Sequence, residues 1–391
     1  MDFLYSARPI GSVEALARAM RINEQQLRNM AAHRHELYDR FKIPKGDGSF
    51  RDILNPRRDL KFVQKRINRV VFEHVLFPSY LFGGVKGRDY VGNANAHARA
   101  KALISLDVRN FYPSIREAHV QRIFQSFCKF PQDVSKLLAG LTTLDDAVPQ
   151  GACTSSNLAN LVFFDAEPGV VKFLAERGLV YSRLLDDISI SSSKRIFGKD
   201  EQTKIIKKIA AMLDTRGMHL KNNKTRVVSV ENPQDLMTVT GLWLNRGRPR
   251  VYRVERLEIR KELHEVLKLF AVSRTSDEYH EKYNRTSGRV AKLTHLGHPE
   301  AKDARESLRK MLPHLDHEAH IRLNRAVTAL ARSDVKKRES WEYVTKYYQL
   351  RYKANILRRS NRRSAQRLNS LLDSCRPAIS HEEIVYERSI G

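Results

Sequence analysis

Two apolar segments of strand character carry acidic residues where a buried strand would not normally have them. The first, KALISLDV, reaches Asp107 near its end, and the second, VYSRLLDDISISS, holds Asp186 and Asp187 in its middle. A carboxylate on an apolar strand costs free energy unless it is paired or bound to a cation. We therefore expect a fold that brings both segments to one site, where their charges are compensated.

Adjacent carboxylates repel each other in a dry setting, and a divalent cation is the usual partner that relieves the repulsion. Two such ions, about 3.5 to 4 Å apart, can activate a 3′-hydroxyl and stabilise a leaving pyrophosphate. Hard oxygen ligands favour two Mg²⁺ ions, with Mn²⁺ as a substitute. A turn or a solvated surface is the plainer interpretation of an Asp pair, and we expect a loop for Asp145 and Asp146, which lie close to a Pro and a Gly.

The chain is strongly basic. Its 391 residues include 70 Lys and Arg against 44 Asp and Glu, which gives a formal net charge of +26. Spread positive charge favours a nucleic acid partner, because Lys and Arg neutralise phosphates whatever the base sequence. An anionic membrane surface is the alternative, but no apolar run approaches the roughly 20 residues of a spanning helix. We expect no membrane partner.

Cysteine usage and the N-terminal residues indicate a cytoplasmic protein. Cys128, Cys153 and Cys375 form no CxxC pair, so neither a disulfide framework nor a zinc site is expected. The opening MDFLYSARPIGS lacks a basic segment followed by an apolar one, which argues against secretion. Reduced thiols are the expectation.

Hydrophobic spacing indicates strands and helices that mix without strict alternation, which favours an α+β fold. Gly46 and Gly48 separate two short strand-like runs in KIPKGDGSFRDILNP, which predicts a hairpin. From residue 254 onward the pattern becomes helical and basic. The expected helices are 13–37, 60–77, 115–127, 155–177 and 201–216, and the expected strands outside the acidic segments are 226–230 and 236–244.

Four motifs, taken in order, resemble those of the reverse transcriptases, specifically the bacterial retron type. LISLDVRNFYPSI is similar to the first catalytic motif, and VPQGACTSSNLANL to the motif that lies against template and nucleotide. YSRLLDDISISS resembles the strand-turn-strand with the catalytic Asp pair, and GMHLKNNKTRVV the next motif with its Lys. NANAH at 93–97 fits the retron NAxxH pattern, and residues 239–241 fit its VTG pattern. The resemblance covers roughly 45–308.

The chain departs from the family pattern in three places. Leu184 and Leu185 stand where an aromatic and a small residue usually precede the Asp pair, and Ser156 stands where a Pro is often found. A long segment also follows the thumb-like residues 287–308. The NAxxH and VTG patterns indicate either a retron enzyme or a closely related defence-associated reverse transcriptase, and the long final segment favours the relative.

The resemblance implies a right-hand polymerase. Its fingers and palm would be built from an antiparallel sheet and helices, followed by a helical thumb and a basic helical C-terminal extension. The implied domains are a helical lead-in at 1–40, fingers and palm at 41–245, the thumb at 246–312 and the extension at 313–391.

The resemblance also implies catalytic roles. Asp107, Asp186 and Asp187 would hold the metal ions together with the carbonyl of Val108, and Lys224 would give a proton to the leaving pyrophosphate.

A nucleotide site is implied as well. Gln150 and Gly151 would line it, and Tyr112 would exclude a ribose 2′-hydroxyl, which predicts a preference for deoxynucleotides. Lys45 and Arg51 would grip the triphosphate. The alternatives are that Tyr112 is a core aromatic residue and that the two basic residues are merely solvated.

The candidate RNA-binding residues are His97, Arg351, Tyr352, Arg358 and Arg359. A lone His is also a common structural hydrogen-bonding residue. The other four lie in a basic tail with interleaved tyrosines, which is typical of an RNA-contacting helix. A solvated helix with its tyrosines packed on the thumb is the competing interpretation.

Together these implications predict an RNA-directed DNA polymerase. It would copy a structured noncoding RNA into DNA from deoxynucleoside triphosphates, within an antiphage defence system, and an effector protein or a second copy of the chain is a candidate partner. One alternative is a catalytically silent RNA-binding scaffold. Another is a group II intron type enzyme, although the chain has no endonuclease motif.

Overall fold

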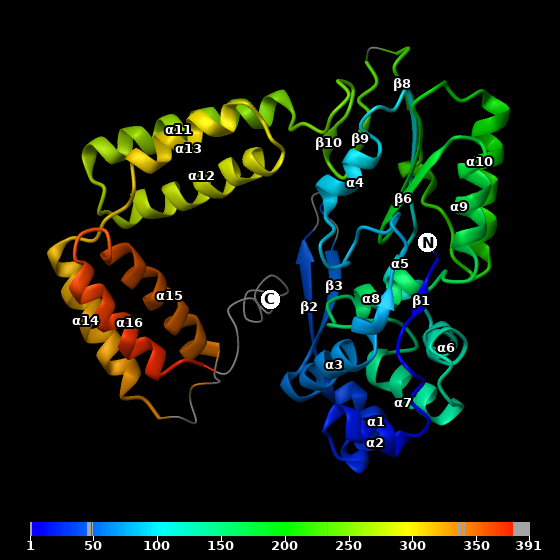
Figure 1. Ribbon diagram of the computed structural model, residues 1–391, viewed down its shortest axis with the longest axis horizontal. Helices are drawn as coiled ribbons and strands as arrows, with labels where there is room; N and C mark the ends of the chain where they lie inside the picture. Colours follow the sequence, from blue (N-terminus) through cyan, green and yellow to red (C-terminus); the bar gives the residue numbers. More distant parts are fainter. Residues whose placement is uncertain are drawn as a thin grey trace. The chain divides into compact units, whose positions relative to one another are not determined.

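The structure, a computed structural model, describes residues 2–44, 48, 50–232, 234–334, 338 and 341–377. The chain forms two compact units, Met1–Arg250 and Val251–Gly391. The first unit combines strands and helices, whereas the described part of the second is helical (Figure 1). This mixture of elements agrees with the expected α+β class.

Four strands form an antiparallel sheet in the first unit: β5 (Ala102–Asp107), β6 (Val180–Leu184), β7 (Asp187–Ser192) and β8 (Arg226–Ser229). Their order across the sheet is β6-β7-β5-β8, so β5 is an inner strand. Five of its six residues are buried. Burial on both faces explains why this segment is almost continuously apolar rather than alternating.

The described residues also form three two-stranded antiparallel sheets. One of them is the hairpin predicted at 42–56, which the structure confirms and extends to residue 38. The predicted strand 236–244 is a tight pair of two-residue strands instead of one continuous strand. The pairs are β2 (Tyr38–Pro44) with β3 (Phe50–Pro56), β1 (Leu4–Tyr5) with β4 (Val75–Leu76), and β9 (Thr238–Val239) with β10 (Leu242–Trp243).

Several helices of the first unit are shorter than hydrophobic spacing predicts, whereas the helix expected at 201–216 is present with its full length as Lys199–Asp214. Segment 13–37 is divided because Arg21 adopts a φ of 52° and the side chain of Asn23 then caps a new helix. Segment 155–177 is divided as well, and the second helix has Pro168 in its first turn, where proline is favoured. The helices are α1 (Val13–Met20), α2 (Glu24–Ala32), α3 (Arg58–Val70), α4 (Tyr90–Ala96), α5 (Phe111–Ser114), α6 (Glu117–Arg122), α7 (Gln132–Thr142), α8 (Ser155–Leu161), α9 (Glu167–Ala175) and α10 (Lys199–Asp214).

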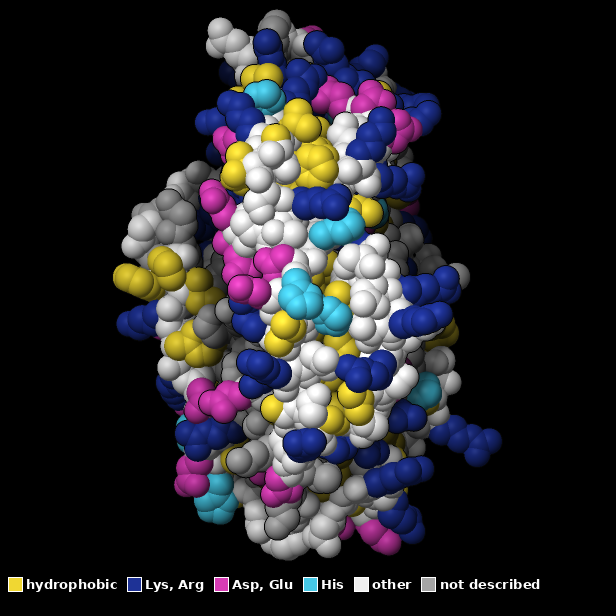
Figure 2. Space-filling view, turned by 90° about the vertical axis from the view of Figure 1, so that its left-hand side faces the viewer, with side chains coloured by type: hydrophobic (Ala, Val, Ile, Leu, Met, Phe, Trp, Pro, Cys, Tyr) yellow, Lys and Arg dark blue, Asp and Glu magenta, His cyan; other side chains and the backbone are white. Residues whose placement is uncertain are grey.

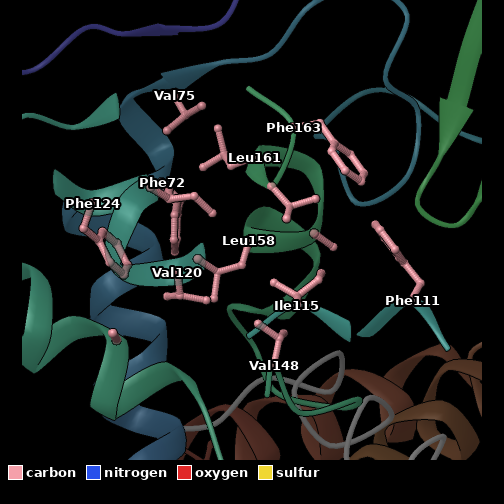
Figure 3. Packing of buried hydrophobic residues seen from close by; sticks show 14 of the residues in the cluster. Phe72, Val75, Phe111, Ile115, Val120, Phe124, Val148, Leu158, Leu161 and Phe163 are labelled. Atoms are coloured by element: carbon pink, nitrogen blue, oxygen red, sulfur yellow. The ribbon is translucent and has the colours of Figure 1, made fainter. Parts of the chain in front are cut away.

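One continuous hydrophobic core holds these elements together. Figure 3 shows Leu158 and Leu161 of α8 pointing toward Phe72 and Val120, which come from other parts of the chain. All four side chains are nearly or fully buried. The core therefore fixes α8, the helix that follows the Pro-Gln-Gly segment.

The second unit contains six helices in its described part, arranged around two separate hydrophobic cores. Among the described residues, none of the helices is both long enough and apolar enough to cross a membrane. The helices around one core are α11 (Arg253–Val272), α12 (Asp277–His295) and α13 (Glu300–Lys310), and those around the other are α14 (His317–Ala331), α15 (Trp341–Leu357) and α16 (Arg362–Ser374).

Candidate active site

The structure brings the two acidic segments together at one end of the central sheet. Asp107, the last residue of β5, stands opposite Asp187, the first residue of β7. Directly opposed residues on antiparallel strands have Cβ atoms about 4.5 to 5.5 Å apart. The N–H of Val108 donates to the carbonyl of Asp186 at 3.1 Å, which fastens the end of β5 to the turn. Asp107 is therefore a neighbour in space of the Asp186-Asp187 pair, which is distant from it in sequence.

The turn between β6 and β7 consists of Leu185 and Asp186. Leu185 has a φ of 59°, in the left-handed region that costs a residue with a side chain about 1 to 2 kcal/mol. Its side chain lies against Gly83, where an added Cβ would stand 2.6 Å from the Leu185 Cγ. Leu184 and Leu185, which depart from the family pattern, are both partly buried. The glycine is what leaves room for the second leucine.

Lys224 forms an ion pair with Asp107, with 2.6 Å between its Nζ and the Oδ2. The backbone N–H of Lys221 donates to the carbonyl of Asp107 at 2.8 Å, so this part of the chain runs beside the end of β5. A short 3₁₀ turn, Asn222–Lys224, then places the ammonium group at the carboxylate. The hydrogen bond to Asp107 raises the pKa of Lys224.

The carboxylate of Asp187 is electrostatically unfavourable where it stands. Loss of hydration around the carboxylate, followed by repulsion from Asp186 and Asp107, raises its pKa to about 6, and Lys224 opposes this shift. Among the described residues, no three His, Cys, Asp or Glu side chains are arranged as a finished metal site. The arrangement is one in which negative charges repel and a cation would be attracted.

Gln150 and Gly151 lie in the loop that leads to α8. The carbonyl of Gln150 accepts from the N–H of Leu54 on β3 at 2.9 Å, which joins the loop to the hairpin. Gly151 has a φ of 120°, which side chains disfavour and glycine permits. Neither feature can be recognised in the sequence without knowing the partner strand.

Two residues of α3 hold the same loop, and the sequence analysis did not identify them. The buried side chain of Gln64 accepts from the N–H of Cys153 at 3.3 Å. Asn68 donates through Nδ2 to the Cys153 carbonyl at 2.9 Å. A signal was available, because Gln64 and Asn68 are four residues apart and lie on one face of the predicted helix.

The remaining nucleotide-site candidates are described to different extents. Phe111 is buried in the core, and Tyr112 is partly buried beside it, with ring centroids 5.9 Å apart. Arg51 lies in β3 opposite Ile43, but its side chain is outside the described part of the structure. Lys45 falls outside the described residues altogether.

His97 lies in the interior and is only 1% exposed. Its Nδ1 is 2.7 Å from the Ser191 Oγ on β7, and its Nε2 is 2.7 Å from the Ser182 Oγ on β6. Because Ser182 donates its own proton to Asn93, Nε2 must be the protonated nitrogen. Burial lowers the pKa of His97 to about 4. The predicted RNA contact is corrected here, since a ring enclosed in this way has no surface to offer.

The two retron markers hold the same helix. Asn93 and His97 fasten α4 to the central sheet. Thr240, from the VTG segment, donates through its hydroxyl to the carbonyl of Tyr90, the first residue of α4, at 2.9 Å. The first motif therefore joins α4 to the central sheet, and the second joins the start of α4 to the VTG segment.

The tail tyrosines divide between core and surface. Tyr343 and Tyr347 are buried within the core of α14, α15 and α16, not in the separate core of the thumb-like helices α11 to α13.

Lys and Arg side chains spread over the face seen in Figure 2, among acidic ones. Of the four tail candidates, Arg351 pairs with Asp373 at 2.6 Å, Tyr352 donates to Asn284 at 2.6 Å, Arg359 donates to the Pro313 carbonyl at 2.7 Å, and Arg358 is exposed.

Comparison with known proteins bears on this site. Residues 43–266 match the family described as reverse transcriptase (RNA-dependent DNA polymerase), a range that contains all three carboxylates and Lys224. The chain is 38% identical to the retron Se72 reverse transcriptase of Salmonella heidelberg (strain 579083-10), over 80% of this chain and 82% of that protein. It is 32% identical to the retron Ec48 reverse transcriptase of Escherichia coli, over 91% and 90%.

The match to the family model covers more than half of the chain, and both relatives are matched over most of their length. The four motifs in the sequence lie within the matched range. The chain therefore belongs to the reverse transcriptase family, with retron reverse transcriptases as relatives, and is an RNA-directed DNA polymerase.

Proposed function

We propose that this polymerase transfers nucleotides with two divalent cations held by Asp107, Asp186 and Asp187. The observation that carries the proposal is the strand register that sets Asp107 opposite Asp187. The raised pKa of Asp187 supports it, because a cation between the carboxylates would relieve their repulsion. Carboxylate oxygens, with the carbonyl of Val108, are ligands that fit Mg²⁺ or Mn²⁺.

When bound, such cations activate a 3′-hydroxyl and stabilise the departing pyrophosphate. The residues of the chain itself orient the reactants and supply a proton to the leaving group. Lys224 carries a proton on Nζ beside Asp107, and we assign to it the donation of that proton to the leaving group. Its raised pKa keeps the ammonium form at neutral pH.

The nucleotide would be held between the hairpin and the loop before α8. The backbone link from Leu54 to Gln150 supports this, because it connects the two elements. Gly151 would allow the base to approach the backbone, and Tyr112 would exclude a 2′-hydroxyl. Lys45 and Arg51, at the hairpin, are proposed to contact the triphosphate.

In this proposal the chain is a right-hand polymerase. The lead-in is 1–40 and the fingers and palm are 41–245, both within the first compact unit. The thumb is 246–312 and the extension is 313–391. Separate cores for α11 to α13 and for α14 to α16 support the division of the second part.

We further propose that the template is a cognate structured noncoding RNA, and that the enzyme serves an antiphage system with an effector protein or a second copy as partner. The retron relatives and the net charge of +26 support an RNA partner. Exposed Arg358 is the tail residue best placed to meet a phosphate.

The test uses full-length protein with the RNA that copurifies with it, Mg²⁺ and deoxynucleoside triphosphates. Labelled DNA should appear with the wild-type protein, be sensitive to EDTA and be absent with D186N. Wild-type synthesis that persists unchanged in D186N would refute the role assigned to the acidic turn. Replacement of the deoxynucleotides by ribonucleotides tests the assignment of Tyr112, since Y112A should accept them more readily.

A further inference from the structure

Arg183 on β6 is fully buried, as is its partner Glu167. A guanidinium has five N–H donors, and here every one has an acceptor. Nε and one terminal nitrogen donate to the two oxygens of Glu167, at 2.6 and 2.8 Å. The other three N–H groups donate to the backbone carbonyls of Ala159, Asn160 and Leu185, at 3.1, 3.0 and 3.2 Å.

These carbonyls belong to two different parts of the site. Ala159 and Asn160 lie in the last turn of α8, where helix carbonyls lack partners inside the helix. Leu185 is the first residue of the turn that carries Asp186. One side chain therefore connects the acidic turn to the helix that follows the Gln150 loop.

The rest of the neighbourhood prevents Arg183 from shifting. The backbone N–H of Arg183 donates to the Tyr80 carbonyl at 2.9 Å, and the backbone carbonyl of Arg183 accepts from the Phe82 N–H at 3.0 Å. The outer edge of β6 is therefore also paired. Tyr181, on the same face of β6, donates its hydroxyl to Glu167 at 2.7 Å. The Glu167 carboxylate is thus held by two residues of β6, Tyr181 and Arg183.

We propose that Arg183, together with Glu167, is a positioning residue for DNA synthesis: it fixes the Leu185 carbonyl and thereby aims Asp186 and Asp187 at Asp107. A buried ion pair adds little net stability compared with an apolar pair of similar volume, so stability alone does not explain it. Lysine offers three donors around a point charge and cannot make all five contacts. The inference rests on the proposed role of the acidic turn.

The experiment compares three full-length variants with the wild type. R183K keeps the charge opposite Glu167 but loses contacts to the carbonyls. R183M/E167M removes both charges, which buried pairs tolerate better than removal of one. The control, R34M/E117M, removes a partly buried ion pair of 2.8 Å that lies elsewhere in the same unit. The readouts are kcat, the Mg²⁺ concentration for half-maximal rate, the thermal midpoint, and hydrogen exchange of the turn in metal-free protein.

We expect both Arg183 variants to lose about 10- to 100-fold in kcat, the range seen when groups that orient metal ligands are removed. The half-maximal Mg²⁺ concentration should rise severalfold, and amides of the turn should exchange faster without any metal. The control should change none of these. If R183K or R183M/E167M keeps wild-type kcat, Mg²⁺ dependence and turn exchange, or if only the thermal midpoint falls, Arg183 is merely structural and the inference is wrong.

D186N separates this inference from the proposed function. An active D186N enzyme would remove the role of the acidic turn itself. Inactive D186N beside fully active R183K would leave that role intact and reject only the positioning by Arg183.

Discussion

Two sets of charges meet at the β6-β7 hairpin, one through Arg183 and the other through Asp186 and Asp187, and their surroundings differ completely. In the interior, Arg183 and Glu167 neutralise each other, and each N–H of the guanidinium has an acceptor. At the end of the sheet, three carboxylates repel one another, and the ammonium group of Lys224 opposes this only in part. The fold satisfies the charges of one set and leaves repulsion within the other.

The comparison distinguishes charged groups that hold the fold in place from charged groups that are available to bind a ligand. A fully satisfied group holds its neighbours in one arrangement and has no remaining capacity for a ligand. A group in a repulsive setting is unfavourable in the free protein, and that is where binding sites are often found. The following substitutions attack each side of this contrast.

The largest effect should come from D186N at the acidic turn. We expect kcat to fall by about 10³-fold or more, which corresponds to roughly 4 kcal/mol of transition-state stabilisation. The thermal midpoint of the metal-free protein should stay the same or rise, because one repulsive charge is gone. D200N, an exposed aspartate in the first turn of α10, is the matched control and should be silent in both assays.

R183M alone should give the largest loss of stability. It leaves the buried carboxylate of Glu167 without its partner, which costs about 3 to 5 kcal/mol in comparable buried pairs. Urea unfolding followed by circular dichroism measures this loss. Most of it should be recovered in R183M/E167M, and a double variant as unstable as R183M would contradict our account of the pair.

H97F probes a neutral network on the opposite face of β6. It removes the contacts of the ring with Ser182 and Ser191 and should cost about 1 to 3 kcal/mol, less than R183M because no charge is left buried. S191A, which removes one contact, should cost about 1 kcal/mol. Both values come from the same unfolding assay, and a loss in H97F as large as in R183M would break the contrast between neutral and charged networks.

The smallest net effect concerns the pH dependence of stability in EDTA, where two contributions of opposite sign oppose each other. With a pKa of about 6, above its usual value, Asp187 keeps its proton longer in the folded state, so it lowers stability as pH rises from about 4 to 6. His97, with a pKa of about 4, acts in the opposite sense over about 4 to 6.5. The two contributions oppose each other in the wild type, so D187N should leave a stability that rises with pH and H97F a stability that falls with pH. Identical pH profiles for the two variants would show that neither group is linked to folding as described.

Much of the site could be predicted because its signals are local. The apolar run before Asp107 and the Asp pair between leucine and isoleucine predict strands, and antiparallel pairing then makes these residues neighbours. The order of the four motifs predicted the family. The same local reasoning predicted the hairpin at 42–56.

What could not be predicted depends on partners distant in the chain. Segment 155–177 reads as one helix because its apolar spacing continues through Phe163. In the structure α8 ends earlier, where Arg183 takes up the carbonyls of Ala159 and Asn160. The sequence analysis assigned no role to Arg183, since nothing near it in sequence reveals Glu167 as its partner. His97 was assigned to RNA for a similar reason, because its two serines lie on other elements.

The turn at Leu185 leaves no room for a side chain at residue 83. An added Cβ there would stand 2.6 Å from the Leu185 Cγ and 2.9 Å from the Leu185 backbone nitrogen. Shortening the leucine removes only the first of these contacts, so G83A should stay destabilising in G83A/L185A. A relative that shares this turn should bear glycine at the first position, which lets a reader of related sequences recognise the geometry of the turn before any coordinates exist.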